Sequence, residues 1–188
     1  ARRRIRMTDG HTELRRPIRV RAIPEHFVLR TTDKEREALA ERFSVSSIPA
    51  LSANIALEET DAGIVATGTL DAEIVQPCAV TREDFDYAVH ESVALLFVPE
   101  GQATRYEEDE EVELDSTAPD EIEYDGDEFD LGEALAQTLG LAIDPYREGP
   151  DADEARAAAG IESDEDVDAA PKGPLAEALA GLRTDKGE

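Results

Sequence analysis

The chain is most constrained by residues 51–98, which contain three consecutive stretches where apolar and polar residues alternate. An alternation of period two is typical of a strand with one buried face and one solvent face. The stretches 51–57, 64–75 and 85–98 follow one another through short connections, the first of which holds the turn-forming Gly63. Strands so close in the chain pair most readily as an antiparallel meander. The sequence therefore predicts one antiparallel sheet around which the rest of the chain is arranged.

Two helices are predicted to cover this sheet. The first spans residues 33–43 and starts with a capping box, in which Thr32 is the N-cap and Glu35 reaches back to its amide. The second follows Asp130 as its N-cap and carries an apolar stripe. That stripe consists of Leu131, Leu135, Leu139 and Ile143. Because all these apolar faces need burial, the expected fold class is α+β, an antiparallel β-meander covered by two or three helices.

Shorter features are predicted around this framework. Residues 17–24 and 26–30 alternate well enough to form short strands, and residues 121–124 can form another. Gly68 lies among the apolar positions of the second central stretch. A glycine there predicts a β-bulge or a close-packed neighbour.

Charge divides the chain into unlike parts. The formal net charge is −26 at pH 7, yet the first thirty residues hold nine arginines against three acids. Residues 1–16 lack apolar periodicity and are predicted to be a basic flexible arm, ahead of an α+β domain at residues 17–147. Within that domain, residues 100–130 carry fifteen acids and a single base, Arg105. Such blocks of like charge are normally solvated, so we expect this acidic segment to be mobile.

The last part of the chain, residues 148–188, is an acidic, alanine-rich tail with short helices predicted at residues 152–159 and 175–182. The basic start of the chain is not followed by the apolar stretch of a signal peptide. Nothing in the chain approaches the roughly 18 uninterrupted apolar residues that a membrane span needs. The sequence predicts a cytoplasmic protein with no membrane partner.

The uneven charge indicates two binding preferences. The acidic body repels nucleic acid phosphates, whereas the basic arm attracts them. The favourable partner for an acidic block is a cluster of lysine and arginine. The candidate RNA-contacting residues of the arm are Arg2, Arg3, Arg4, Arg6, Arg15 and Arg16. The candidate residues for binding a basic partner are Glu107, Glu108, Asp109, Glu110 and Glu111.

No catalytic constellation is visible in the sequence. Cys78 is the single cysteine, and no histidine is expected beside it, as a thiol nucleophile would need. A free cysteine usually behaves as a small buried apolar residue, and this interpretation is preferred for Cys78. One cysteine and scattered histidines do not supply the four ligands of a zinc site, and no phosphate-binding or dinucleotide motif is present. We expect no enzymatic activity, no metal, no cofactor and no small-molecule substrate.

A series of short motifs, in order along residues 16–183, resembles a known family. The motifs are Arg16–Val20, Glu37–Phe43, Gly63–Gly68, Val75–Thr81, Leu96–Glu100, Tyr124–Gly126, Asp130–Glu133, Leu141–Tyr146, Ala155–Gly160 and Leu179–Arg183. Their order and spacing are similar to those of the YceD-like large ribosomal RNA subunit accumulation proteins, in the form found in alphaproteobacteria. Other branches carry a Cys-x-x-Cys pair where this chain has Cys78 and Thr81, so a metal or redox role of that pair is not carried over.

The resemblance implies a non-enzymatic role in the accumulation of large-subunit ribosomal RNA, and hence in ribosome biogenesis. Together with the charge pattern, it suggests a factor whose body holds a basic large-subunit ribosomal protein while the arm touches precursor ribosomal RNA. Two alternatives stay open. One is an acidic structural or interaction protein of a salt-adapted organism, with no ribosomal link and with an arm that only aids solubility. The other is an enzyme that depends on Cys78.

Overall fold

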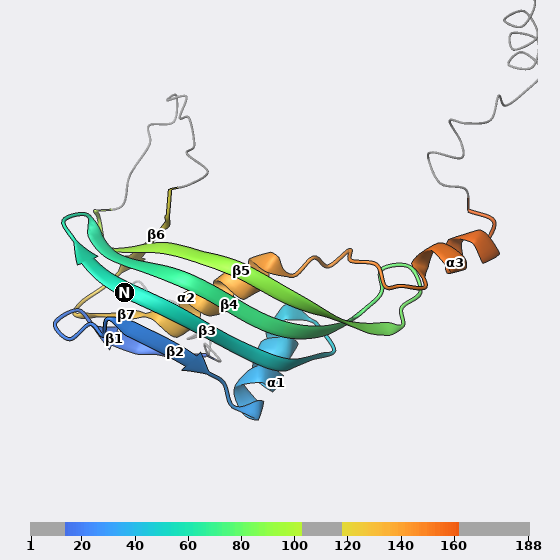
Figure 1. Ribbon diagram of the computed structural model, residues 1–188, viewed down its shortest axis with the longest axis horizontal. Coiled ribbons are helices and arrows are strands. Elements are labelled where there is room, and N and C mark those ends of the chain that lie inside the picture. Colours follow the sequence, from blue (N-terminus) through green and yellow to red (C-terminus); the bar gives the residue numbers. More distant parts are fainter. Residues whose placement is uncertain (1–13, 103–117, 162–188) are drawn as a thin grey trace, which may run out of the picture.

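The structure, a computed structural model, describes residues 14–102 and 118–161. In it, strands β2 to β6 form a five-stranded sheet in the order β2-β3-β4-β5-β6, and β1 pairs with β7 (Figure 1). The elements in chain order are β1 (Pro17–Arg19), β2 (His26–Arg30), α1 (Asp33–Phe43), β3 (Ser47–Thr60), β4 (Gly63–Pro77), β5 (Asp84–Pro99), β6 (Asp120–Tyr124), β7 (Glu128–Asp130), α2 (Leu131–Ala142) and α3 (Ala152–Ala158).

The three central strands confirm the predicted meander. β3 pairs antiparallel with β4, and β4 pairs antiparallel with β5 over nearly their whole lengths. Ile55, Leu70 and Val93 belong to the apolar phases of these strands and are at most 3% exposed. Residues in the opposite phase, such as Asn54 and Thr69, are exposed. The period-two pattern thus corresponds to one buried face and one solvent face.

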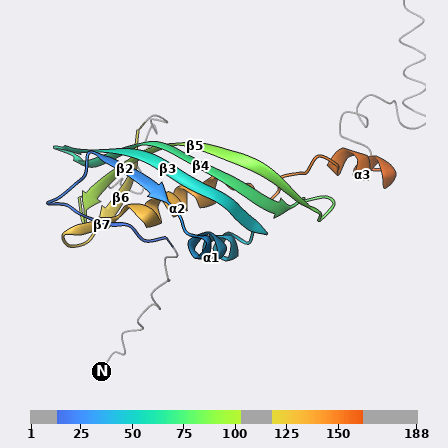
Figure 2. The ribbon, with the colours of Figure 1, turned by 60° about the horizontal axis from the view of Figure 1, so that its bottom comes forward.

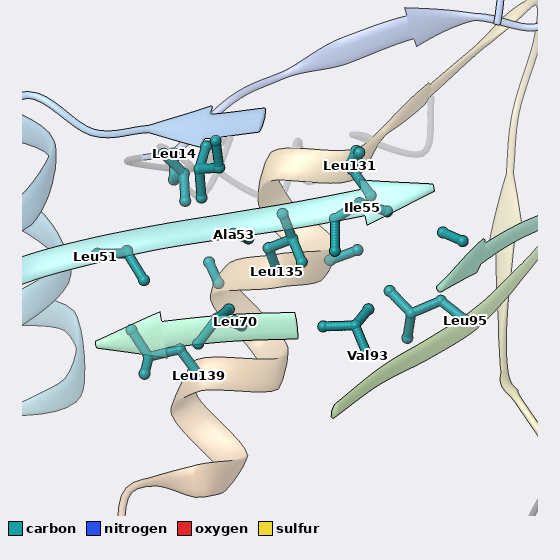
Figure 3. Packing of buried hydrophobic residues seen from close by; sticks show 14 of the residues in the cluster. Leu14, Leu51, Ala53, Ile55, Leu70, Val93, Leu95, Leu131, Leu135 and Leu139 are labelled. Carbon is teal, nitrogen blue, oxygen red and sulfur yellow. The ribbon is translucent and has the colours of Figure 1, made fainter. Parts of the chain in front are cut away.

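Two helices, α1 and α2, lie on the buried face of the sheet, as predicted (Figure 2). The capping box that starts α1 is present, since the side chain of Thr32 accepts from the Glu35 N–H and that of Glu35 accepts from the Thr32 N–H. Asp130 caps α2 by accepting the N–H of Glu133. The α2 stripe points at the sheet, and Leu135 is fully buried beneath it (Figure 3). Packing on the sheet, rather than helix propensity, therefore fixes the position of α2.

Gly68 is explained by a close-packed neighbouring strand and not by a β-bulge. Its pairing with Ile55 continues the register of the surrounding residues without interruption. A Cβ built on Gly68 would lie 2.0 Å from the main-chain oxygen of Asn54. The neighbouring backbone therefore occupies the space that any side chain would need, which explains a glycine inside a strand.

The C-terminal end of the acidic segment, residues 120–130, contains β6 and β7, and β6 includes the strand predicted at residues 121–124. β6 pairs with β5 in parallel, and the residues of β7 pair with β1. Phe129 is buried, with its ring centroid 4.4 Å from that of Phe97. Strand pairing and this aromatic contact hold residues 120–130 in place despite their charge. Because β6 runs parallel to β5, the sheet is not antiparallel throughout. Residues 103–117, with the acidic block, lie outside the described part of the chain.

The start of the chain also differs from the prediction. Leu14 is fully buried, so the fold begins before the predicted end of the arm at residue 16. β1 ends at Arg19, where the Ala22 N–H donates to the Arg19 oxygen in a turn, and the strand does not continue to residue 24. A Cβ on Gly132 would lie 2.6 Å from the Leu14 oxygen, so the chain start packs directly on α2. Contacts of this kind depend on distant residues and leave no periodic signal.

The short helix predicted at residues 152–159 is present as α3. It lies beyond the end of the β4–β5 hairpin, away from α1 and α2 (Figures 1 and 2). The other short helix predicted in the tail, at residues 175–182, falls outside the described residues.

Candidate functional site

Most residues that the charge pattern singled out fall outside the described part of the chain. They are Arg2, Arg3, Arg4 and Arg6 of the arm and Glu107, Glu108, Asp109, Glu110 and Glu111 of the acidic block. The structure describes Arg15 and Arg16, and both belong to the folded domain rather than to the arm. Arg15 is 67% exposed at its side chain and lies 3.2 Å from the carboxylate of Asp130. Its role in RNA contact stays a prediction.

Arg16 connects the start of the domain to three other elements. Its main-chain N–H donates to Asp130 Oδ1 at 2.8 Å, at the N-cap of α2. Its guanidinium donates to Glu35 Oε1 at 2.7 Å on α1, and to the main-chain oxygen of Arg30 at 3.1 Å on β2. A guanidinium held by a carboxylate and a carbonyl is suited to fixing these elements together. The structure thus gives Arg16 a role in the fold, and its predicted RNA contact remains untested.

Replacing Glu35 with glutamine is expected to reduce stability in a pH-dependent way. The hydrogen bond from Arg16, helped by those from Thr32, lowers the pKa of Glu35 to about 2. Because this pKa lies below that of the unfolded chain, ionised Glu35 stabilises the fold above about pH 4.5, and the contribution is lost as the pH falls toward 2. Hydrogen bonds to a charged group suggest a loss of about 1–2 kcal/mol at pH 7.

Urea unfolding of the wild type, E35Q and the exposed control E37Q between pH 7 and pH 2 measures this contribution. The difference between the wild type and E35Q should be largest at pH 7 and should shrink as the pH falls below 4.5. A difference that stays constant over this range contradicts the assignment.

The best-connected polar arrangement lies where the β4–β5 hairpin meets residues 144–149, the segment after α2, here called the strap. Gln76, on β4, is 3% exposed and donates through Nε2 to the main-chain oxygen of Asp144 at 2.9 Å. The Tyr87 hydroxyl donates to Gln76 Oε1 at 2.8 Å, and the Arg147 guanidinium lies 4.1 Å from the centroid of the Tyr87 ring. The Ala79 N–H donates to the Arg147 oxygen at 3.1 Å. The strap is thus bound to the hairpin through both side chains and backbone.

The thiol of Cys78 is buried beneath the strap and is 1% exposed, as the sequence predicted. Its Sγ accepts the N–H of Gly149 at 3.2 Å, of Val80 at 3.3 Å and of Thr81 at 3.4 Å. Donors favour the thiolate form, and the N–H groups of Thr81 and Gly149 are the main reason that the pKa of Cys78 falls to about 7. The thiolate is thus stabilised, but solvent and reagents cannot reach it.

Alkylation of Cys78 in the native protein at neutral pH is expected to be slow, because access rather than ionisation limits the reaction. Gly149→Ala should accelerate it. An alanine Cβ would lie 3.1 Å from the Phe85 ring and 3.4 Å from Cys78 Cβ, so the strap or the ring must shift slightly beside the thiol. Labelling with iodoacetamide, followed by mass spectrometry, compares the variant with the wild type. Ala157→Gly on exposed α3 is the control. Rapid labelling of the wild type contradicts the core assignment and reopens a reactive role.

Sequence reasoning missed the side chains that hold the strap. A signal was present, because Gln76 is a polar residue in the apolar phase of β4 and a buried amide requires hydrogen-bond partners. The structure also gives two of the recognised motifs a common explanation. Val75–Thr81 supplies Gln76 and Cys78, and Leu141–Tyr146 supplies the Asp144 oxygen. Distant stretches of sequence therefore form one contact.

Residues 14–102 and 118–161 contain neither a cluster of metal-binding side chains nor a membrane-spanning helix. No group of three or more histidine, cysteine, aspartate or glutamate side chains there could hold a metal ion. None of the helices described for these residues has the length and apolar character needed to cross a membrane. The arrangement at Cys78 fixes the loop after β4 and the strap to each other.

Comparison with known proteins gives one positive result. The model of the family described as "Large ribosomal RNA subunit accumulation protein YceD" matches residues 66–183, which is more than half of the chain. No curated protein and no solved structure matches the chain significantly. The match covers most of β4, all of β5 and β6, the strap, and the α2 helix that covers the sheet. The chain therefore belongs to the YceD family of large ribosomal RNA subunit accumulation proteins.

Proposed function

We propose that this protein is a non-enzymatic ribosome biogenesis factor that acts in the cytoplasm by holding a basic protein of the large ribosomal subunit. A role in the accumulation of large-subunit ribosomal RNA follows from family membership, which is the observation that carries the proposal. The net charge of −26 supports the choice of partner. A body so acidic is repelled by RNA phosphates and attracted to the lysine and arginine clusters of ribosomal proteins.

The acidic block, Glu107 to Glu111, and the basic arm at the start of the chain, which includes Arg2, Arg3, Arg4 and Arg6, have opposite preferences. The block favours a basic protein, whereas the arm favours precursor ribosomal RNA beside it, in a contact that weakens steeply with salt. The side chain of Arg15 lies next to the arm and is exposed, but it is paired with the carboxylate of Asp130, so the proposal relies on the other arginines of the arm. Each part of this division of labour has its own test.

A pull-down from cell extract tests the proposal with three baits. These are the intact protein, a protein without residues 1–13, and a protein with Glu107 to Glu111 replaced by neutral residues. We expect the intact bait to retain large-subunit proteins and precursor RNA, the neutralised bait to lose the proteins, and the truncated bait to lose mainly RNA. If the intact bait retains neither, the ribosomal proposal fails. If both variants retain them equally, only the charge mechanism fails.

An acidic protein of a salt-adapted organism, without a ribosomal link, is not favoured by the family match. It makes a separate demand, because mutual repulsion of the acids should then destabilise the fold as salt is removed. Thermal unfolding in low and high salt measures this property. The ribosomal proposal does not depend on such a loss of stability at low salt.

A further inference from the structure

One edge of the main sheet is open over a long stretch. β6 pairs with β5 only at residues 95–99, and the strap contacts the other end of β5 at Phe85 and Tyr87. Between them, residues 88–94 make ladder hydrogen bonds only with β4 among the described parts of the chain. Figure 1 shows β6 beside one end of β5 and no strand along its middle. Backbone N–H and C=O groups of an open edge are a template for a further strand.

The size of this open edge suits a bound peptide. Residues 88–94 span about 23 Å at the usual rise of a strand, enough for a strand of average length. On the solvent face the edge carries Ala88, Ser92 and Ala94, which are exposed and small. The Nδ1 atom of His90 lies 2.7 Å from Oδ1 of Asp71 on β4, so this side chain is directed over its own sheet and away from the open edge. No large side chain therefore blocks the approach of another backbone.

The two outer edges of the sheet differ in charge. Along the β5 edge, Asp86 lies before the open stretch, Glu91 within it, and Asp120 after it at the start of β6. These acids outnumber the base Arg147, which lies over Tyr87. The edge strand on the other side, β2, carries His26 and Arg30. The main-chain oxygen of Arg30 already accepts a hydrogen bond from the Arg16 guanidinium. Charge therefore directs a basic segment to β5 and away from β2.

We propose that residues 88–94 of β5 bind an extended segment rich in lysine and arginine, which adds to the sheet as a further strand. Main-chain hydrogen bonds supply affinity in this mode of recognition, and side-chain charges select the partner. The inference rests on the proposed function, since such a segment belongs to the basic large-subunit protein that the body holds. RNA is a poor occupant because the edge is acidic, and two β5 edges paired antiparallel about the centre of this stretch would bring their Glu91 side chains together.

Amide hydrogen exchange on the full chain tests the inference. The probe is a synthetic peptide of about ten residues in which lysine alternates with valine, long enough for one strand. We expect the outward-facing amides among residues 88–94 to exchange at least about tenfold more slowly when the peptide is bound, and the amides of β2 to stay unchanged. Protection at β2 but not β5, or no protection at all, overturns the proposal. So does full protection of residues 88–94 in the free protein, because the edge would then already be occupied.

Two control peptides separate strand addition from simple charge attraction. A peptide with glutamate in place of lysine should give no protection. A peptide with the same lysines but with proline in place of valine keeps the charge and cannot form a ladder, so it should also fail. Equal protection by the proline peptide overturns strand addition.

Matched variants locate the charge. Glu91→Lys should weaken binding of the lysine–valine peptide several-fold, whereas Glu58→Lys, an equivalent change at an exposed position of β3, should leave it unchanged. The pull-down separates failure of the edge proposal from failure of the proposed function. Suppose that E91K retains as much large-subunit protein as the intact bait does, and that these proteins do not change hydrogen exchange at residues 88–94. The edge proposal then fails and the proposed function stands.

Discussion

Replacing Leu135 with alanine is expected to lower the free energy of unfolding by about 2–5 kcal/mol. Leu135 is fully buried at the centre of the contact between α2 and the sheet, among residues of several strands (Figure 3). The change removes apolar contacts and leaves a cavity that the long, paired strands cannot collapse to fill. Urea unfolding at neutral pH measures the loss from the midpoint and slope of the transition.

The same helix provides a matched control. Leu141 is 87% exposed, so Leu141→Ala removes the same atoms without opening a cavity. Its effect should stay within about 0.5 kcal/mol of the wild type. Similar losses for L135A and L141A would contradict the position of α2 against the sheet.

Replacing Gly68 with alanine is the second large effect that we expect. The added Cβ would lie 2.0 Å from the Asn54 oxygen, and backbone cannot move aside as a flexible side chain can. Alanine gains about 0.5–1 kcal/mol over glycine through the unfolded chain. Overpacking at this distance should outweigh that gain and leave a net loss of about 3 kcal/mol.

Thr69→Ala on the exposed face of the same strand is the control, and it should cost less than about 1 kcal/mol. Both variants can be compared by urea unfolding and by hydrogen exchange of the β3 and β4 amides. A stable G68A with unchanged protection of these amides would show that the two strands are further apart at Gly68 than the structure places them.

The sequence predicted the central framework because its signals are local. The alternation in β3, β4 and β5 reports which face of each strand is buried, and short connections leave antiparallel pairing as the simplest arrangement. The caps at Thr32 and Asp130 are likewise written in neighbouring residues. Strand bounds shifted by a few residues, since the register of β3 shifts between Ser47 and Ala50 and the buried position at the end of β4 is the polar Gln76.

Features that depend on distant residues could not be predicted in the same way. β6 is parallel to β5 because the chain returns to that edge after residues 103–117, and no periodicity encodes the direction of a returning strand. The acidity of residues 120–130 suggested mobility, and the decisive counterweight is one side chain, Phe129, buried on Phe97. A count of charges takes no account of a single buried aromatic contact.

The candidate site shows the same division. Cys78 was predicted to be buried from residue type alone, but the strap that covers it involves the distant Gly149 and Asp144. Arg16 appeared as one arginine of a basic arm, and its pairing with Glu35 becomes visible only when β1, β2 and α1 are assembled. Composition gives the sign of the charge, whereas the fold decides which charges are already paired.

The ratio of large-subunit to small-subunit ribosomal RNA in cells that lack this protein tests the account most directly. We expect this ratio to fall on loss of the protein, to recover with the wild-type chain, and to recover only in part with a chain whose Glu107 to Glu111 are neutral. A ratio that does not change when the protein is removed would contradict its role in large-subunit RNA accumulation.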